Sequence, residues 1–103
     1  MQKIDMYIPL PSEVTIKESN IEGLGLFSTC NIEEEHNLGI THIENTDFEN
    51  GYIRTPLGGF INHSNTPNCK IFNNGTVLVL ITKQPIPADT ELTTFYALYE
   101  IPN

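Results

Sequence analysis

The sequence lacks the features by which several large classes of protein are recognised. It has no tryptophan, and its two cysteines stand alone rather than in a Cys-x-x-Cys pair. No stretch approaches the roughly 20 apolar residues that a membrane-spanning helix needs, and no amphipathic pattern extends over three helical turns. These absences argue against a zinc cluster, a disulfide-rich scaffold, a helical bundle and a membrane span.

Basic residues are scarce as well. Thirteen acidic residues against five lysines and arginines give a formal net charge of -8 at pH 7. The basic residues form no run, and without a basic cluster the chain is not expected to bind nucleic acid directly. An acidic surface attracts a basic peptide or protein; solubility alone is the alternative explanation of this charge.

The cysteines and the first residues indicate a compartment. Cys30 and Cys69 are predicted to be two small buried side chains in a reducing environment. The start of the chain has neither a basic segment nor an apolar run, so no signal peptide is indicated. We therefore expect an intracellular protein.

Short strands joined by turns dominate the remaining pattern. The chain has 103 residues, with seven prolines and seven glycines, and is expected to form a single mostly-β domain with few or no long helices. Residues 1–12, with two prolines, are predicted to be an extended leader and residues 13–103 the domain. The expected strands are residues 13–18, 24–27, 38–43, 70–72, 76–82 and 91–96. Asn73-Asn74-Gly75 is a strong hairpin signal.

The segment Gly58–Asn68 carries the most informative pattern. Phe60 and Ile61 form an apolar anchor that is followed at once by Asn62 and His63. Polar side chains attached to a buried anchor must find hydrogen-bond partners in the protein or in a ligand. A plain turn between two strands is the alternative interpretation.

Three separated motifs together resemble those of the SET domain, a family of protein-lysine methyltransferases. They are Gly-Leu-Gly-Leu-Phe at residues 23–27, Phe-Ile-Asn-His-Ser with Pro-Asn at 60–68, and Glu-Leu-Thr-Thr-Phe-Tyr at 91–96. The resemblance spans about residues 13 to 99. It implies a β-clip fold of several small sheets, with a knot-like threading of the C-terminal segment beside the Asn-His-Ser loop.

The resemblance also implies a cofactor, S-adenosylmethionine, and a set of site residues. Glycines without a side chain allow the backbone to approach such a ligand closely. The implied cofactor contacts are Gly23, Leu24, Gly25, Asn62, His63 and Tyr96. Tyr96 is also the implied catalytic residue, since a phenol beside the sulfonium orients the attacking amine. Tyr99, Phe60 and Tyr52 are candidates for the substrate channel, and no metal is implied.

The sequence departs from the family pattern in three places. A Tyr-x-Gly motif is absent, and Tyr52 and His42 are the candidates to replace its tyrosine. Phe95 stands where an aspartate is usual. The zinc-binding cysteines that follow the domain in larger members are missing, so Cys69 is not expected to bind zinc. The leader, a second subunit or the substrate would then close the lysine channel, and a homodimer is one expectation.

Three functions remain open from the sequence. The first is a lysine methyltransferase acting on a basic protein, such as a histone or a host or ribosomal protein, in the manner of a small viral or bacterial member of the family. The second is a catalytically weak or inactive SET fold that binds a protein partner. The third is an unrelated small β-barrel binding module.

Overall fold

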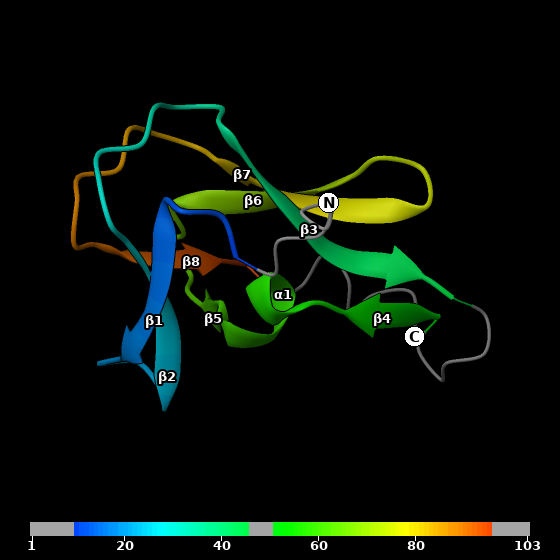
Figure 1. Ribbon diagram of the computed structural model, residues 1–103, viewed down its shortest axis with the longest axis horizontal. Helices are drawn as coiled ribbons and strands as arrows, with labels where there is room; N and C mark the ends of the chain where they lie inside the picture. Colours follow the sequence, from blue (N-terminus) through cyan, green and yellow to red (C-terminus); the bar gives the residue numbers. More distant parts are fainter. Residues whose placement is uncertain (1–9, 46–50, 96–103) are drawn as a thin grey trace, which may run out of the picture.

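The computed structural model describes residues 10–45 and 51–95, and these form two small four-stranded sheets joined by one short helix (Figure 1). In chain order the elements are β1 (Val14–Glu18), β2 (Leu24–Ser28), β3 (Asn37–Glu44), β4 (Tyr52–Arg54), α1 (Pro56–Phe60), β5 (Asn62–His63), β6 (Cys69–Asn73), β7 (Val77–Thr82) and β8 (Glu91–Thr94). The mostly-β prediction without a long helix is confirmed.

The first sheet has the strand order β1-β2-β8-β5 and brings together parts of the chain that are distant in sequence. β1 and β2 form an antiparallel hairpin, and β8 pairs with β2 so that Leu26 faces Leu92. Both side chains are completely buried. On its other edge β8 runs parallel to β5, which places Asn62 beside Thr93 and His63 beside Thr94.

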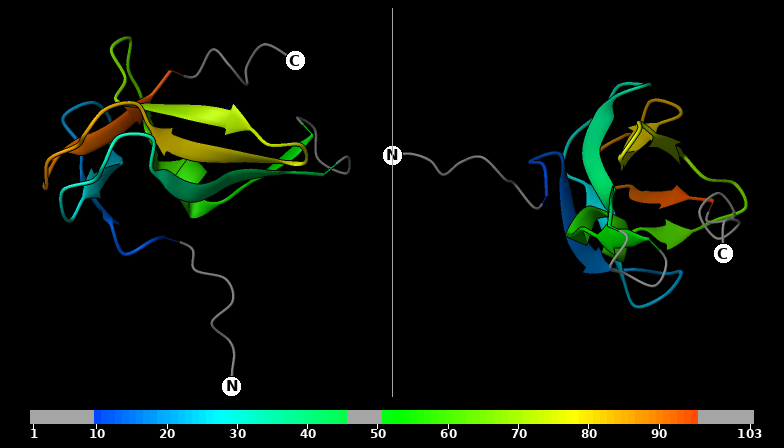
Figure 2. Two further views of the ribbon diagram at one scale, coloured as in Figure 1. Left: turned by 90° about the horizontal axis from the view of Figure 1, so that it is seen from above. Right: turned by 90° about the vertical axis from the view of Figure 1, so that its right-hand side faces the viewer.

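The second sheet has the order β4-β3-β7-β6, and β7 lies at its centre. β7 lies within residues 76–82, which the sequence predicted to be a strand, and Leu80 within it is completely buried. β6 and β7 are antiparallel and joined by the predicted turn, in which Gly75 has a positive φ of 87°. The two sheets contact each other through β6 and β8, and α1 touches both of them, β2 in the first and β3 and β4 in the second (Figure 2).

Helix α1 leads directly into the polar residues of β5. The Thr55 hydroxyl accepts a hydrogen bond from the amide of Gly58, and Pro56 begins the helix, both of which favour a helix start. Gly58 allows the helix to lie against β3, because a Cβ there would come within 2.5 Å of the Thr41 carbonyl oxygen. Ile61 returns to an extended conformation and is 1% exposed, so it anchors the start of β5.

Two predictions from the sequence need comment. Cys69 is buried as expected, but Cys30 is exposed, because it lies in the connection after β2 rather than on the inner face of a strand. The predicted leader is described only from Leu10. Leu10 packs against the core, and the carbonyls of Pro11 and Ser12 accept hydrogen bonds from the Val14 amide and the Thr29 hydroxyl. Among the described residues, no helix is long and apolar enough to cross a membrane.

Candidate functional site

The side chain of Asn62 connects three parts of the chain. Its Nδ2 lies 3.1 Å from the carbonyl oxygen of Glu22, in the turn between β1 and β2, and 3.4 Å from that of Leu24, the first residue of β2. It also lies 2.9 Å from Oε2 of Glu91 and 3.1 Å from Oγ of Ser19. Four oxygens around one amide nitrogen identify that nitrogen as the donor end of the side chain.

The acceptor end of Asn62 is left uncommitted. Within residues 10–45 and 51–95, all hydrogen bonds of this side chain involve Nδ2, and none involves Oδ1. The residue is only half-buried, and Oδ1 keeps the capacity to accept a hydrogen bond from a ligand. A polar side chain fixed at one end and open at the other is suited to orienting a ligand.

Gly25 leaves room for two side chains of the protein itself. A Cβ at this position would lie 2.3 Å from Oε2 of Glu91 and 3.1 Å from Nδ2 of Asn62. The space that glycine leaves is therefore occupied by the protein's own carboxylate and amide. The absence of a side chain at Gly25 thus leaves room for the Asn62–Glu91 contact.

Gly23 and Leu24 present open backbone and an exposed side chain. Gly23 has a positive φ of 47°, a conformation that favours glycine, and a Cβ there would meet nothing within 4 Å. Its carbonyl accepts a hydrogen bond from the Ser19 amide, which closes the turn. Leu24 is 49% exposed although it begins a strand. The turn therefore offers an accessible surface beside Asn62.

His63 lies beside the end of β8. Its ring centroid is 5.1 Å from that of Phe95 in a tilted arrangement, and its Nε2 is 3.2 Å from Oδ1 of Asn65. The next residue in the sequence is Tyr96, which lies outside the described residues together with Tyr99.

Asn68 fastens the polar loop to β8. Its Nδ2 donates to the carbonyl of Glu91, and its Oδ1 accepts from the amide of Thr93, both at 2.9 Å. The side chain thus replaces a strand partner on this edge of β8. The Pro-Asn motif marked this residue in the sequence, but nothing in the sequence indicated its partners.

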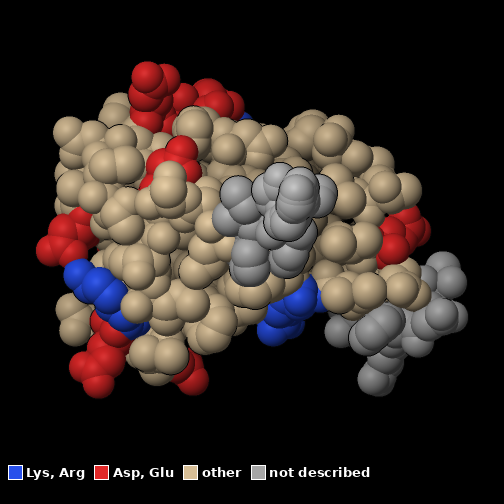
Figure 3. Space-filling view, viewed as in Figure 1, with Lys and Arg blue, Asp and Glu red and all other residues tan. Residues whose placement is uncertain are grey.

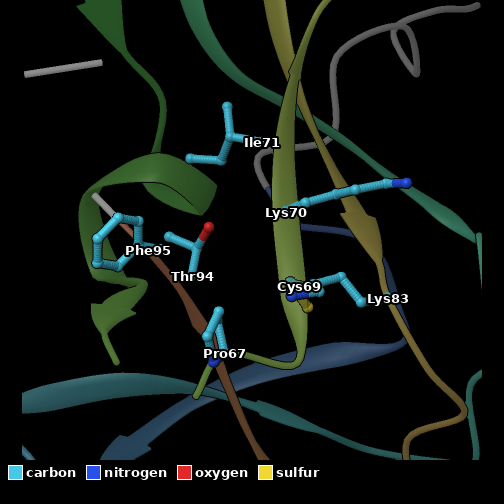
Figure 4. Close-up of a pocket in the computed structure, with 7 residues that line it drawn as sticks. All are labelled: Pro67, Cys69, Lys70, Ile71, Lys83, Thr94 and Phe95. Atoms are coloured by element: carbon cyan, nitrogen blue, oxygen red, sulfur yellow. The ribbon is translucent and has the colours of Figure 1, made fainter. Parts of the chain in front are cut away.

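A cavity of about 190 Å³ lies between β6 and the end of β8 (Figure 4). Cys69 and Ile71 contribute from β6, and Thr94 and Phe95 from the end of β8 and the residue that follows it. Phe95 lines this cavity and also contacts His63. The cavity is mostly apolar and open to one side, as small-molecule sites commonly are.

Among the described residues, no group of three or more His, Cys, Asp or Glu side chains could hold a metal ion. The two cysteines do not supply one, since Cys30 is exposed and Cys69 is buried in the core. Burial raises the pKa of the Cys69 thiol to about 12, so this thiol stays protonated at neutral pH.

A model of the SET domain family matches residues 37–97. The chain belongs to the SET domain family. Among curated proteins, no sequence matches significantly. Among the solved structures that share the fold of this SET domain are the two that follow, and both are too different in sequence to show more than the fold.

The first is a candidate histone methyltransferase of Plasmodium falciparum, with a TM-score of 0.69 and 20% identity over 84% of this chain and 94% of that one. The second is the methyltransferase domain of human PR domain-containing protein 2, with a TM-score of 0.66 and 15% identity over 84% of this chain and 78% of that one.

The remaining candidates are spread over the SET domain. Phe60 ends α1 and packs partly against the core, two residues from Asn62. Tyr52 lies in the other sheet, where its ring meets that of His42 edge-on at 6.0 Å. Burial, and then the charge of Arg54, lower the pKa of His42 to about 4, so His42 is neutral at pH 7. Tyr52 and His42 thus belong to the β3–β4 pairing, apart from the sheet that holds Asn62.

Sequence reasoning missed Glu91 and Ser19 as parts of the site. Glu91 was recognised only as the first letter of a motif, and Ser19 received no role. The Ser19 hydroxyl donates to both carboxylate oxygens of Glu91 and accepts from the amides of Ile21 and Glu22. No local sequence pattern predicts a contact such as that between Ser19 and Glu91, which are 72 residues apart.

Proposed function

We propose that this SET domain is an S-adenosylmethionine-dependent methyltransferase that transfers a methyl group to a lysine of a basic protein. The observation that carries the proposal is the arrangement of Asn62 above the turn at residues 22–24, with its Oδ1 uncommitted. This arrangement occurs in a chain whose family includes methyltransferases of known fold.

The residues present fit the cofactor. Its methionine end carries an ammonium group, which donates hydrogen bonds and so matches the available Oδ1 of Asn62. The open backbone at Gly23 admits a ligand to the turn, since no side chain blocks it. The adenine end is assigned to the side of His63 and Phe95, where an aromatic wall and the adjoining cavity lie.

When bound, the cofactor supplies an electrophilic methyl group on a sulfonium. The protein's contribution is then to hold the lysine amine in line and to keep it neutral. Orientation of this kind lowers a barrier by about 7–11 kcal/mol in favourable cases. Tyr96 follows Phe95 directly, and we assign to its phenol the orientation of the amine.

The charge of the molecule supports a basic substrate. The formal net charge is -8, and acidic side chains lie on several edges of the face shown in Figure 3, where basic ones are few. Attraction between opposite charges speeds the encounter with a lysine-rich partner. Raising the salt concentration should therefore slow methylation of a basic protein more than it weakens cofactor binding.

Cofactor binding is tested by calorimetric titration with S-adenosylmethionine. We expect micromolar affinity for the wild type and a loss of at least about tenfold, or 1.4 kcal/mol, for Asn62→Ala. Asn74→Ala, in the exposed hairpin turn between β6 and β7, is the matched control and should bind as the wild type does. Equal affinity of the Asn62 variant and the control would contradict the role of Asn62.

Methyl transfer is tested separately with a labelled methyl group and histones or ribosomal proteins as acceptors. Tyr96→Phe should keep cofactor affinity and lose most of the transfer, with Tyr99→Phe as the comparison. Binding without transfer to any basic protein would favour the second candidate, a SET fold that binds a partner without catalysis. Unchanged transfer by Tyr96→Phe would refute the assigned role.

A further inference from the structure

We propose that Glu91 is a positioning residue of the site: together with Ser19 it fixes the amide of Asn62 so that Oδ1 is presented to the ligand. The proposal deepens the function proposed above and rests on it. It concerns how the ligand contact is held and assigns no contact between Glu91 and the ligand itself.

The Glu91 carboxylate contacts both Asn62 and Ser19. Oε2 of Glu91 lies 2.9 Å from Nδ2 of Asn62, and the Ser19 hydroxyl lies 2.9 and 2.8 Å from the two carboxylate oxygens. Hydrogen bonds to a charged acceptor are about twice as strong as neutral ones. The Glu91–Asn62 bond is therefore the strongest of the contacts that hold this amide.

These contacts impose one orientation on the Asn62 amide. If the amide turned over, Oδ1 of Asn62 would face the Glu91 carboxylate and the carbonyls of Glu22 and Leu24. An oxygen there would be repelled by the carboxylate charge and would face carbonyl oxygens that cannot donate, and the nearby Ser19 hydroxyl already donates to Glu91. The environment thus selects one of the two orientations, and it is the one that leaves Oδ1 uncommitted.

Glu91 is itself held in place by its neighbours. The next residue, Leu92, is completely buried against β2, and the carbonyl of Glu91 accepts a hydrogen bond from Asn68. Gly25 leaves the space that the carboxylate fills. Both the backbone and the carboxylate of Glu91 are therefore held in place without a ligand, as preorganisation of a binding group requires.

Glu91→Gln tests the proposal with little change of shape. Glutamine offers one acceptor and one two-proton donor, so it cannot accept from Ser19 and Asn62 as a carboxylate does. We expect S-adenosylmethionine affinity to fall about five- to twentyfold. Glu44→Gln, at an exposed position of β3, makes the same change in net charge and should leave affinity unchanged.

A double-mutant cycle decides whether Glu91 acts through Asn62. In the Asn62→Ala background, Glu91→Gln should cause no further loss, because the group that it positions has gone. Equal and additive losses in both backgrounds would overturn the proposal, since Glu91 would then act on the ligand directly or only on stability.

A measurement without ligand keeps the proposal separate from the proposed function. In NMR spectra of the free protein, the side-chain amide protons of Asn62 should exchange slowly in the wild type and in Glu44→Gln. In Glu91→Gln their resonances should shift and exchange at least about threefold faster, at unchanged backbone dispersion. Identical resonances in all three proteins would refute the positioning role. Slow exchange without any binding of S-adenosylmethionine would overturn the proposed function and leave the positioning contact in place.

Discussion

Acidification should destabilise this SET domain through His42. The imidazole is 3% exposed, its Nδ1 lies 2.8 Å from the Thr41 hydroxyl, and Tyr52 and Arg54 lie on the neighbouring strand. Burial, and then the charge of Arg54, lower the pKa of His42 from 6.5 to about 4. Between pH 6.5 and 4, His42 is therefore mostly protonated in the unfolded chain but mostly neutral in the folded protein.

The difference between the pKa of His42 in the folded and in the unfolded protein determines how the free energy of unfolding changes with pH. Between pH 6.5 and 4 the unfolded state binds more protons at this residue than the folded state does, so unfolding becomes more favourable as the pH falls. The loss is nearly absent at pH 7, reaches about 2 kcal/mol at pH 5, and levels off near 3 kcal/mol below pH 4. Such a loss is a large fraction of the stability of a small domain.

Urea unfolding at pH 7 and pH 5 measures the effect. His42→Asn keeps a polar group near Thr41 but does not titrate in this range, and it should lose about 2 kcal/mol less than the wild type between the two pH values. His36→Asn, at a more exposed histidine that faces Glu13, is the control and should retain the His42-dependent loss. The same pH dependence in the wild type and in His42→Asn would refute the reasoning.

Three more substitutions or modifications probe the site and the core. Gly25→Ala places a methyl group where the Glu91 carboxylate lies and should weaken S-adenosylmethionine binding at least about tenfold in calorimetric titration. Asn68→Ala leaves two backbone groups of β8 without their partner, and urea titration should show a loss of about 1–3 kcal/mol in the free energy of unfolding. A thiol reagent at neutral pH should label Cys30 in the folded protein and Cys69 only after unfolding, as peptide mass spectrometry will show.

Matched variants accompany these measurements. Gly59→Ala meets only the Arg54 side chain at 3.6 Å, an ordinary contact, and should bind the cofactor as the wild type does. Cys30→Ser should abolish labelling of the folded protein. Equal cofactor binding by Gly25→Ala and Gly59→Ala would contradict the role of Gly25. Wild-type stability of Asn68→Ala would contradict the contribution of its hydrogen bonds to β8. Labelling of Cys69 before unfolding would contradict its burial.

Much of the fold was predictable because its signals are local. The Asn73-Asn74-Gly75 turn requires positive φ at glycine, and the apolar run that follows is too β-branched for a helix; both predictions are confirmed. The three motifs identified the family, which the match to residues 37–97 confirms. The exposure of Cys30 was not predictable, because it depends on where a connection runs rather than on the residue type.

The sequence by itself determined which side chains this SET domain has for its site: a glycine-rich turn, Asn62, His63 and the motif that begins with Glu91. Only the tertiary structure decided how they combine. Parallel pairing of β5 with β8, and pairing of β8 with β2, bring Ser19, Asn62 and Glu91 within hydrogen-bond distance. The physical reason is that strand patterns report which face is buried, whereas contacts across 29 to 72 residues depend on which strands pair and in what register.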